Sequence, residues 1–180
     1  SDTGGSVRIP ASLCGIVGLK TTVGRVSNYG TLALAETLDT IGPMTRDVED
    51  AALLFNAMHG FDPHDAATLP HAQADALRDL HGGVTGMRFA ILPHAELGEL
   101  DPEVATAFAA ALGVLRALGA RIEPITLPTG YKRMADLVGK IIAAEGYALH
   151  RDWIDRDDLP FDLDVRDRIR WAKNLSAADY

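Results

Sequence analysis

The sequence predicts an α/β fold in which a mixed β-sheet is covered by helices. Two observations point to this class. Residues 87–127 contain a short apolar strand, an amphipathic helix and a second strand with short connections, which is the pattern of a parallel βαβ unit. Amphipathic helices are also predicted over 48–59 and 131–153, and such helices bury their apolar face against a sheet.

The first 60 residues predict turns followed by one helix. Residues 1–44 are punctuated by glycines and are expected to form turns and short extended pieces. The helix over 48–59 has Asp47 as its N-cap and ends at Gly60. Its apolar side chains recur at helical spacing and are expected to form one face: Val48, Ala51, Ala52, Phe55 and Met58.

The βαβ unit follows a polar segment, residues 66–86, whose Pro, His, Asp and Gly content predicts a surface crossing. The strand over 87–92 comes next. Asp101-Pro102-Glu103 then starts a helix, with a cap, a first-turn proline and an acid near the positive end of the helix dipole. Gly119 ends this helix, and the second strand covers 121–127. The buried stripe of the helix is expected to be Val104, Phe108, Leu112, Leu115 and Leu118.

Residues 128–180 are predicted to be largely helical. One helix runs from about Tyr131 to Trp153, and a second covers Arg166–Lys173. No internal repeat or low-complexity segment is visible along the chain.

Composition limits the partners and the location of the protein. The net charge of −8 and the pI of about 5.1 argue against a nucleic-acid backbone as a direct partner. No apolar run approaches the roughly 20 residues of a membrane span. A single cysteine allows no internal disulfide and implies no oxidising compartment, and the expected location is cytoplasmic. Cys14, the only cysteine, is expected to be a small buried hydrophobe. The histidines are scattered, so neither a metal nor another cofactor is expected.

The motif that can carry chemistry stands at the beginning of the chain, Asp2-Thr3-Gly4-Gly5-Ser6. Two adjacent glycines remove the Cβ atoms where a substrate carbonyl could press against the backbone. Successive N–H groups in such a turn can converge on an anion. The serine hydroxyl directly behind them can act as a nucleophile, and acyl transfer requires a nucleophile beside donors that stabilise the oxyanion.

Two other interpretations of this pentapeptide stay open on its residues alone. Asp-Thr-Gly also begins the active-site loop of aspartic proteases, which are all-β proteins, whereas long helical patterns dominate this chain. A glycine turn can also cap a helix or bind an anion without any catalytic role.

Several further blocks follow the pentapeptide in order. They are SDTGGSVRIPASLCGIVGLKTTVGRVS over residues 1–27, Thr37–Arg46, Val48–Leu54, and Asp62-Pro63 with Asp65. Together they resemble the amidase signature family, whose members cleave carboxamides with a Ser–cis-Ser–Lys triad. The resemblance is dense over the first third of the chain. It implies one large mixed sheet with helices on both faces, and a chain that is an internal piece of that fold, truncated at both ends.

The same resemblance implies a single partial amidase domain over residues 1–180. Its expected parts are a nucleophile-motif core over 1–65, the surface crossing over 66–86, the βαβ unit over 87–127, and a helical, substrate-variable region over 128–180.

The resemblance also assigns roles to individual residues. Ser6 is expected to be the catalytic nucleophile. Main-chain N–H groups of the preceding residues, together with that of Ser6, are expected to bind the oxyanion and the substrate: Thr3, Gly4 and Gly5. An alanine at either glycine is expected to reduce activity by placing a Cβ where the substrate sits.

Charged residues near the motif are expected to support it. Asp2 and Arg8 are predicted to form a partly buried ion pair that pins the ends of the loop. The triad lysine and the cis-serine are expected upstream of residue 1. Lys20 is the nearest lysine, but it matches a Gly-Leu-Lys-Pro-Thr block that is not catalytic in the family, with Thr21 in place of the proline.

The expected function is an amidase that hydrolyses the C–N bond of a small linear amide through a serine acyl-enzyme, giving a carboxylate and ammonia or an amine. The family also includes the glutaminase-like A subunit of the tRNA-dependent amidotransferase, which is one alternative. An inactive truncated fragment is the other. A homodimer is consistent with the resemblance.

Overall fold

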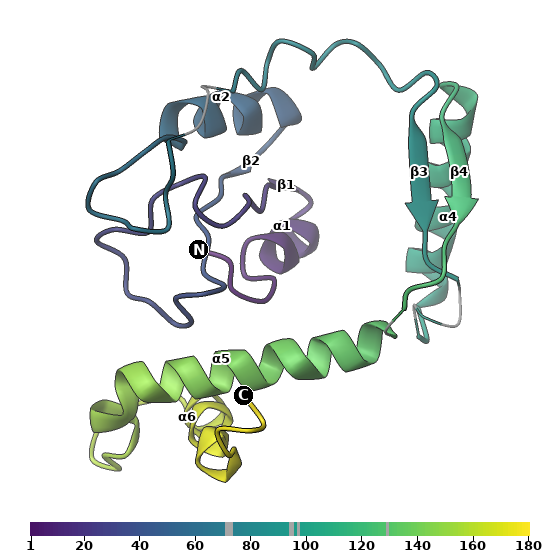
Figure 1. The fold of residues 1–180 in the computed structure, drawn as a ribbon. Helices are drawn as coiled ribbons and strands as arrows, with labels where there is room; N and C mark the ends of the chain where they lie inside the picture. Colours follow the sequence, from purple (N-terminus) through teal and green to yellow (C-terminus); the bar gives the residue numbers. More distant parts are fainter. Residues whose placement is uncertain (71–73, 94–95, 97, 129) are drawn as a thin grey trace. The chain divides into compact units, whose positions relative to one another are not determined.

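The computed structural model describes residues 1–70, 74–93, 96, 98–128 and 130–180 (Figure 1). The chain forms two units, each of which is described by itself. Unit 1 contains Ser1–Arg78 and Leu137–Tyr180, and unit 2 contains Asp79–Asp136. The four contiguous parts that the sequence predicts therefore do not coincide with the units, because the C-terminal helices fold with the N-terminal motif.

The N-terminal half of unit 1 contains two helices and a small antiparallel sheet. Its elements are α1 (Arg8–Cys14), β1 (Val17–Gly18), β2 (Met44–Thr45) and α2 (Val48–Met58). In the sheet, Val17 pairs with Thr45 and Gly18 with Met44. Two buried alanines of α2, Ala51 and Ala52, face the interior of the unit.

Two glycines allow very close backbone packing around this sheet. A Cβ on Gly42 would lie only 1.9 Å from the carbonyl oxygen of Leu19. A Cβ on Gly18 would lie 2.7 Å from Cβ of Ala11 and 2.8 Å from the carbonyl oxygen of Val7. Only glycine fits at these distances, so the turn before α1, β1 and the segment leading into β2 are in direct backbone contact.

The structure confirms most of what the sequence predicts for helix α2. The Asp47 side chain accepts a hydrogen bond of 2.8 Å from the Asp50 N–H, and the helix ends one residue before the predicted boundary. Val48 of the predicted apolar face is exposed, because it lies in the first turn, whereas Ala51 and Ala52 are buried.

Helix α1 and the exposure of Cys14 differ from the predictions. The sequence predicts turns over 1–44, but Arg8–Cys14 is helical and ends at Gly15, which adopts the left-handed conformation. Cys14 is the last helical residue and is exposed, so its prediction as a buried hydrophobe is wrong.

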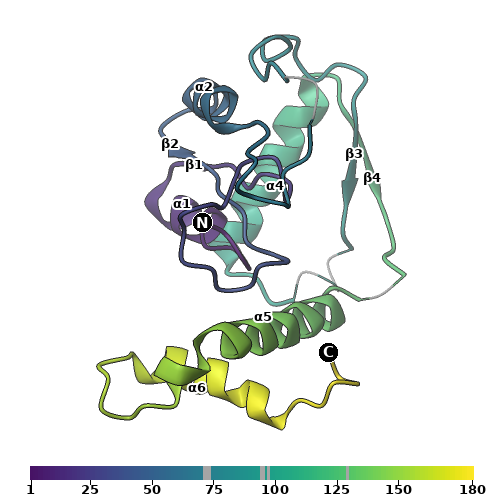
Figure 2. The ribbon, with the colours of Figure 1, turned by 60° about the vertical axis from the view of Figure 1, so that its left-hand side comes forward.

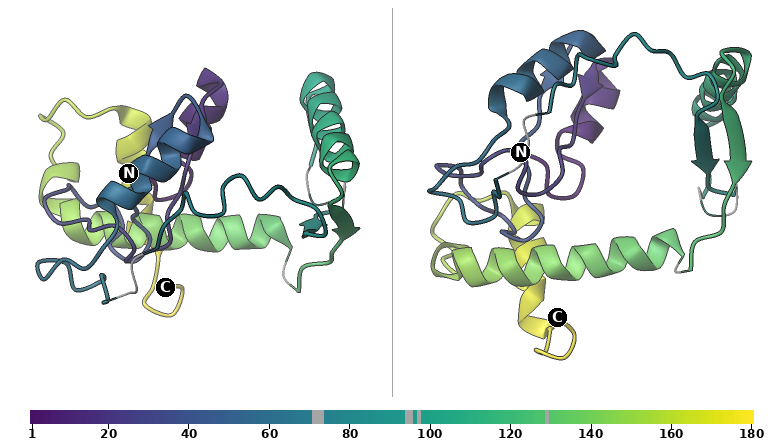
Figure 3. Two further views of the ribbon diagram at one scale, coloured as in Figure 1. Left: turned by 90° about the horizontal axis from the view of Figure 1, so that it is seen from above. Right: turned by 45° about the horizontal axis from the view of Figure 1, so that its top comes forward.

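The C-terminal half of unit 1 contains the end of α5 (Tyr131–Ile154), α6 (Leu163–Arg170) and the 3-10 helix η1 (Trp171–Asn174). Figure 3 shows α6 crossing α5. Arg170 ties the two helices together, because its Nε donates a hydrogen bond of 2.9 Å to the carbonyl of Ile154. Ile154 is buried, as are Ile169 and Ala172. Both helices that the sequence predicts after residue 128 are therefore confirmed.

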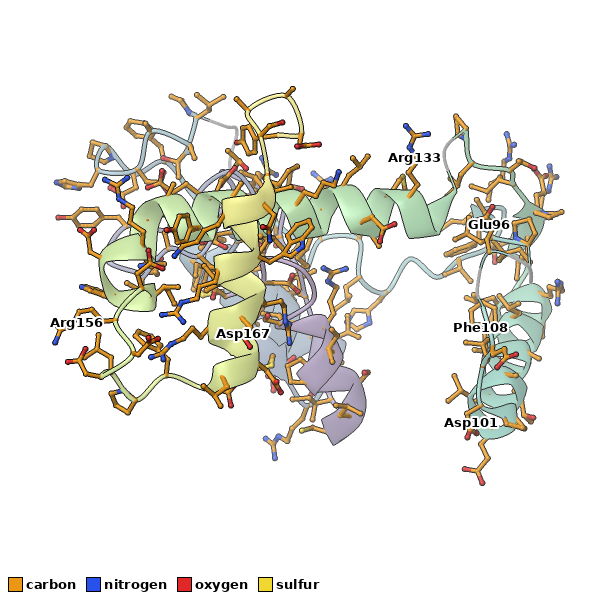
Figure 4. The ribbon with its side chains drawn as sticks, turned by 90° about the horizontal axis from the view of Figure 1, so that it is seen from below. Glu96, Asp101, Phe108, Arg133, Arg156 and Asp167 are labelled. Atoms are coloured by element: carbon orange, nitrogen blue, oxygen red, sulfur yellow. The ribbon has the colours of Figure 1, made fainter. Side chains whose placement is uncertain are left out.

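Unit 2 is the predicted βαβ unit. It contains β3 (Arg88–Ile91), α4 (Pro102–Ala117) and β4 (Arg121–Pro124), and the two strands pair in parallel with Arg88 opposite Arg121 (Figures 1 and 2). Asp101 lies at the beginning of α4, where its side chain accepts a hydrogen bond of 2.9 Å from the Glu103 N–H (Figure 4). The predicted cap and first-turn proline are confirmed.

The predicted buried stripe of α4 is wrong. Val104, Phe108 and Leu118 are 55%, 42% and 56% exposed, and Leu112 and Leu115 are only half-buried. The helical spacing is correct, but two four-residue strands offer a face too narrow to cover the whole stripe.

The fold class is α/β, with antiparallel pairing in unit 1 and parallel pairing in unit 2. The described parts of the predicted surface crossing, 66–70 and 74–86, contain turns; its residues 71–73 lie outside the described part of the chain. No helix that the structure describes has the length and apolar character needed to cross a bilayer. The described residues contain no group of three His, Cys, Asp or Glu side chains that could hold a metal ion, and His71 and His94 lie outside them.

Candidate active site

The Ser1–Val7 loop, which carries the predicted motif, is held by the segment around Thr40. The Asp2 N–H donates a hydrogen bond of 2.8 Å to the Thr40 carbonyl, and the Thr40 N–H donates one of 3.0 Å to the Asp2 carbonyl. The Thr40 hydroxyl donates a second hydrogen bond of 3.0 Å to the same Asp2 carbonyl. Both residues are buried, and these hydrogen bonds fix the backbone at the start of the loop.

The carboxylate of Asp2 organises the rest of the loop. It is fully buried and accepts hydrogen bonds from the N–H groups of Gly5 at 2.8 Å, Val7 at 3.2 Å and Arg8 at 3.4 Å. These N–H groups lie at the start of α1, where the helix itself provides no acceptor. Asp2 therefore closes the loop on itself and caps α1 at the same time.

Arg8 completes this arrangement with the predicted ion pair. Its Nε donates to Asp2 Oδ2 and its Nη2 to Asp2 Oδ1, both at 3.0 Å. Burial by itself would raise the pKa of Asp2. The hydrogen bonds from Arg8, Val7 and Gly5 outweigh it and hold the pKa of that carboxyl well below its ordinary value. Asp2 is therefore ionised near neutral pH.

Ser6 lies at the turn between this loop and α1. It is exposed, whereas its neighbours Gly5 and Val7 are buried. Among the described residues, its hydroxyl makes no hydrogen bond. Gly5 adopts a φ of 135°, which side-chain-bearing residues rarely adopt, and this conformation turns the chain between the buried carboxylate and the exposed hydroxyl.

The loop amides fall into two groups. The Gly5 N–H is occupied by Asp2, so the expectation that it binds an oxyanion does not fit this geometry. The N–H groups of Thr3, Gly4 and Ser6 meet no acceptor among the residues that the structure describes. Three of the four expected donors thus have no acceptor in the described part of the chain.

A side chain at Gly5 would meet the protein itself. A Cβ there would lie 2.6 Å from Cδ1 of Ile9, and one on Gly4 would lie 3.3 Å from Cδ1 of Ile142. The expectation that an alanine at Gly5 acts by crowding the substrate therefore needs correction, because the first conflict is with Ile9 and with the backbone conformation.

Asp39 binds the other side of the loop. The Thr3 hydroxyl donates to Asp39 Oδ1, and the N–H groups of Leu34 and Ala35 donate to Oδ2 at 2.7 Å and 3.1 Å. The side-chain amide of Asn28 donates to the Asp39 carbonyl at 2.9 Å. The sequence contains no local signal for the bond between Asp39 and Thr3, which are 36 positions apart.

Helix α5 also contacts this region, which sequence reasoning missed. Ile142 approaches Gly4, and Glu145 accepts hydrogen bonds from the Thr37 N–H at 3.0 Å and the Thr37 hydroxyl at 2.5 Å. Thr37 and Glu145 are 108 positions apart in the sequence, and no local sequence pattern predicts a contact over that separation.

Lys20 is not placed as a base for Ser6. It is exposed, and its Nζ donates a hydrogen bond of 2.6 Å to the carbonyl of the next residue, Thr21. No hydrogen bond among the described residues joins Lys20 to Ser6.

A family model described as Amidase matches residues 1–177, which includes this loop and nearly the whole chain. The chain belongs to the amidase family. Curated relatives of this chain include the A subunit of glutamyl-tRNA(Gln) amidotransferase from Geobacter sp. (strain M21), 46% identical over 128 residues. The corresponding subunit of Enterococcus faecalis is 48% identical over 129 residues. Each alignment covers 71% of this chain, and the chain spans about a quarter (26%) of the length of either relative.

Solved structures of family members share the fold of this chain. The amidotransferase A subunit of Thermotoga maritima is 39% identical with a TM-score of 0.78, over 96% of this chain and 36% of that one. An inhibitor-bound complex related to the origins of an s-triazine catabolic enzyme reaches a TM-score of 0.88 at 30% identity, over 99% and 38%. Peptide amidase of Stenotrophomonas maltophilia is 32% identical with a TM-score of 0.73, over 89% and 33%.

Proposed function

We propose that this chain carries the nucleophile of an amide hydrolase and that the nucleophile is Ser6. The observation that supports this is the juxtaposition in the Ser1–Val7 loop. An exposed serine hydroxyl follows amides without an acceptor among the described residues, on Thr3 and Gly4, in a loop that Asp2 holds through the N–H groups of Gly5 and Val7. A preorganised loop with unoccupied donors is what stabilises an oxyanion at low reorganisation cost.

The reaction proceeds in two acyl transfers. The hydroxyl oxygen of Ser6 attacks the carbonyl carbon of the amide while its proton passes to a base, and the carbonyl oxygen becomes an oxyanion that the loop amides bind. The C–N bond then breaks, and the nitrogen leaves with a proton as ammonia or an amine. Water attacks the resulting ester, the bond to Ser6 breaks, and a carboxylate is released.

The base is the lysine that the family resemblance implies, reached through a second serine. Both are expected before residue 1, and Lys20 is not a substitute because it is exposed and bonded to Thr21. A lysine can act as a base only when burial and neighbouring donors lower its pKa.

Covalent labelling tests the assignment of Ser6. The product of the complete gene is treated with a fluorophosphonate, digested and mapped by mass spectrometry. We expect the label on the peptide that contains Ser6, and no label and no amide hydrolysis in a Ser6→Ala variant. The exposed Ser12 of α1 is a matched control, because Ser12→Ala removes a hydroxyl that, among the described residues, bonds to the Ile9 carbonyl within its own helix. Labelling of another serine, or undiminished turnover of Ser6→Ala, would contradict the proposal.

A second candidate is the glutaminase-like A subunit of a tRNA-dependent amidotransferase. It is favoured by the 46–48% identity to two proteins of that name. The loop chemistry is the same in both candidates, so the partner and the substrate decide. Release of ammonia from glutamine, together with co-purification of partner subunits, would favour the amidotransferase. Hydrolysis of simple amides by the protein without partner subunits would favour the stand-alone amidase. For that candidate we also expect a homodimer and a cytoplasmic location.

A further inference from the structure

Asp39 is a buried carboxylate whose hydrogen bonds join two separate segments of unit 1. One oxygen accepts from the Thr3 hydroxyl in the motif loop, and the other accepts from the N–H groups of Leu34 and Ala35. The Asp39 backbone is itself braced, because its carbonyl accepts from Asn28 and its N–H donates to the carbonyl of Ala35 at 2.8 Å. The carboxylate therefore has little freedom to move.

Thr3 lies between two fixed points of the loop. The backbone of Asp2 before it is held by Thr40, and the Gly5 N–H after it is held by the Asp2 carboxylate. The side-chain bond to Asp39 fixes Thr3 itself. Ahead of Ser6, the amides of Thr3 and Gly4 are the two without an acceptor in the described part of the chain, and their directions depend on the peptide planes on either side of Thr3.

We infer that Asp39 is a positioning residue for the reaction, acting through the hydroxyl of Thr3 to aim the amides of Thr3 and Gly4 at the oxyanion. The inference rests on the proposed function, because it needs an oxyanion at Ser6. Asp39 does not touch the reacting atoms. Its effect is geometric, and displacement of such a donor by about 1 Å can cost about 100-fold in rate.

Asp39 also has a purely structural role, in which it holds the turn at Leu34 and Ala35. Thr3→Val separates the two roles, because it removes the bond from the loop and leaves both bonds to the turn. Thr3→Ser keeps a hydroxyl at the same position. Thr45→Val is a matched control, because Thr45 also makes one side-chain hydrogen bond, of 2.7 Å to the Asp47 carbonyl, in β2 of the same unit.

The experiment measures the reaction of Ser6 with a fluorophosphonate in the product of the complete gene, so that no substrate has to be known. The dependence of labelling rate on probe concentration separates the maximal rate from the apparent binding constant. For Thr3→Val we expect a maximal rate about 10- to 100-fold lower, with the binding constant near that of the wild type. Thr3→Ser should recover most of the rate, and Thr45→Val should react like the wild type.

Three outcomes would overturn the inference: a wild-type rate in Thr3→Val, a loss that Thr3→Ser does not recover, or an equal loss in Thr45→Val. Asp39→Asn should show the same selective loss of rate, and the Thr3 variants decide if it does not fold. Ser6→Ala separates the two levels of proposal. If Ser6→Ala is labelled like the wild type, the proposed function fails, and the inference fails with it. If only Ser6 is labelled but Thr3→Val reacts normally, only the role of Asp39 is wrong.

Discussion

The guanidinium of Arg8 donates a hydrogen bond of 3.0 Å to each oxygen of the Asp2 carboxylate. The two residues have different surroundings, because Asp2 is fully buried while the Arg8 side chain is 52% exposed. The negative charge of the buried Asp2 is thus neutralised by a guanidinium group at the protein surface. The loop amides that Asp2 also binds would have no acceptor without it.

Replacing Asp2 with alanine should therefore destabilise the protein. The buried N–H groups of Gly5 and Val7 lose their acceptor, and each buried donor left without a partner costs about 1–3 kcal/mol. We expect Asp2→Ala to lower the free energy of unfolding by about 2–4 kcal/mol in urea denaturation of the complete gene product. Asp152→Ala is the control, because Asp152 is 90% exposed and lies 3.7 Å from Arg151. It should change stability by less than about 0.5 kcal/mol, and an equal loss in both variants would contradict the role of Asp2.

The contribution of Asp2 to the free energy of unfolding should disappear in acid. Its folded pKa lies below the ordinary value of 3.8, so the folded state binds this proton less readily than the unfolded state. The stability it provides is complete above the ordinary pKa and is lost as the pH falls from there toward the folded pKa. We expect the difference in unfolding free energy between wild type and Asp2→Asn to be constant near pH 7 and to shrink below about pH 4. A difference independent of pH down to about pH 3 would show that the charge of Asp2 is not responsible.

Gly5→Ala should be more damaging than Gly30→Ala. Gly30 has a φ of 81° and no atom within 4 Å of a Cβ placed on it, so alanine there should cost about 1–2 kcal/mol for its backbone conformation alone. Gly5 adds the contact with Ile9 at 2.6 Å to an unfavourable φ, and about 2–4 kcal/mol is expected. Thermal and urea unfolding measure both variants. The loss of stability caused by Gly5→Ala should be smaller in an Ile9→Ala background than in the wild type. An equal loss in both backgrounds would exclude the steric explanation.

Two glycines of helix α5 should respond to alanine in opposite ways. Gly139 has nothing near its Cβ position, so Gly139→Ala should stabilise the protein by about 0.5–1 kcal/mol through helix propensity. A Cβ on Gly146 would lie 3.2 Å from both Cδ1 and the carbonyl oxygen of Leu34. Gly146→Ala should therefore bring no gain, or a loss. Equal stabilisation in urea unfolding would show that α5 does not pack on Leu34 at this distance.

The elements that the sequence predicts well are those with local signals. Asp47 and Asp101 cap α2 and α4 through N–H groups two or three residues away, and their helices have the expected lengths. The parallel pairing of β3 with β4 follows from the short connections around α4. The Asp2–Arg8 pair is also local, since six positions separate its members.

The sequence does not predict elements and contacts that lack the usual adjacent or short-range signal. Helix α1 begins without a side-chain cap from its N-cap residue, Val7, and its acceptor is instead the Asp2 carboxylate six residues before Arg8. Pro10 does not prevent the helix, since it lies in the first turn, where its missing N–H would have no helical acceptor. The bonds of Thr3 to Asp39 and of Thr37 to Glu145 span 36 and 108 positions, so only the folded chain reveals them.

The contact of Gly42 with Leu19 limits how this fold can be altered. The segment that follows β1 and the segment that leads into β2 touch through main-chain atoms, so neither can change its path without the other. Because Thr40 belongs to the segment that leads into β2 and holds Asp2, the spacing of these two main chains also determines where the motif loop begins. A chimaera between family members should therefore exchange residues 16–20 and 39–45 together, as one inherited piece.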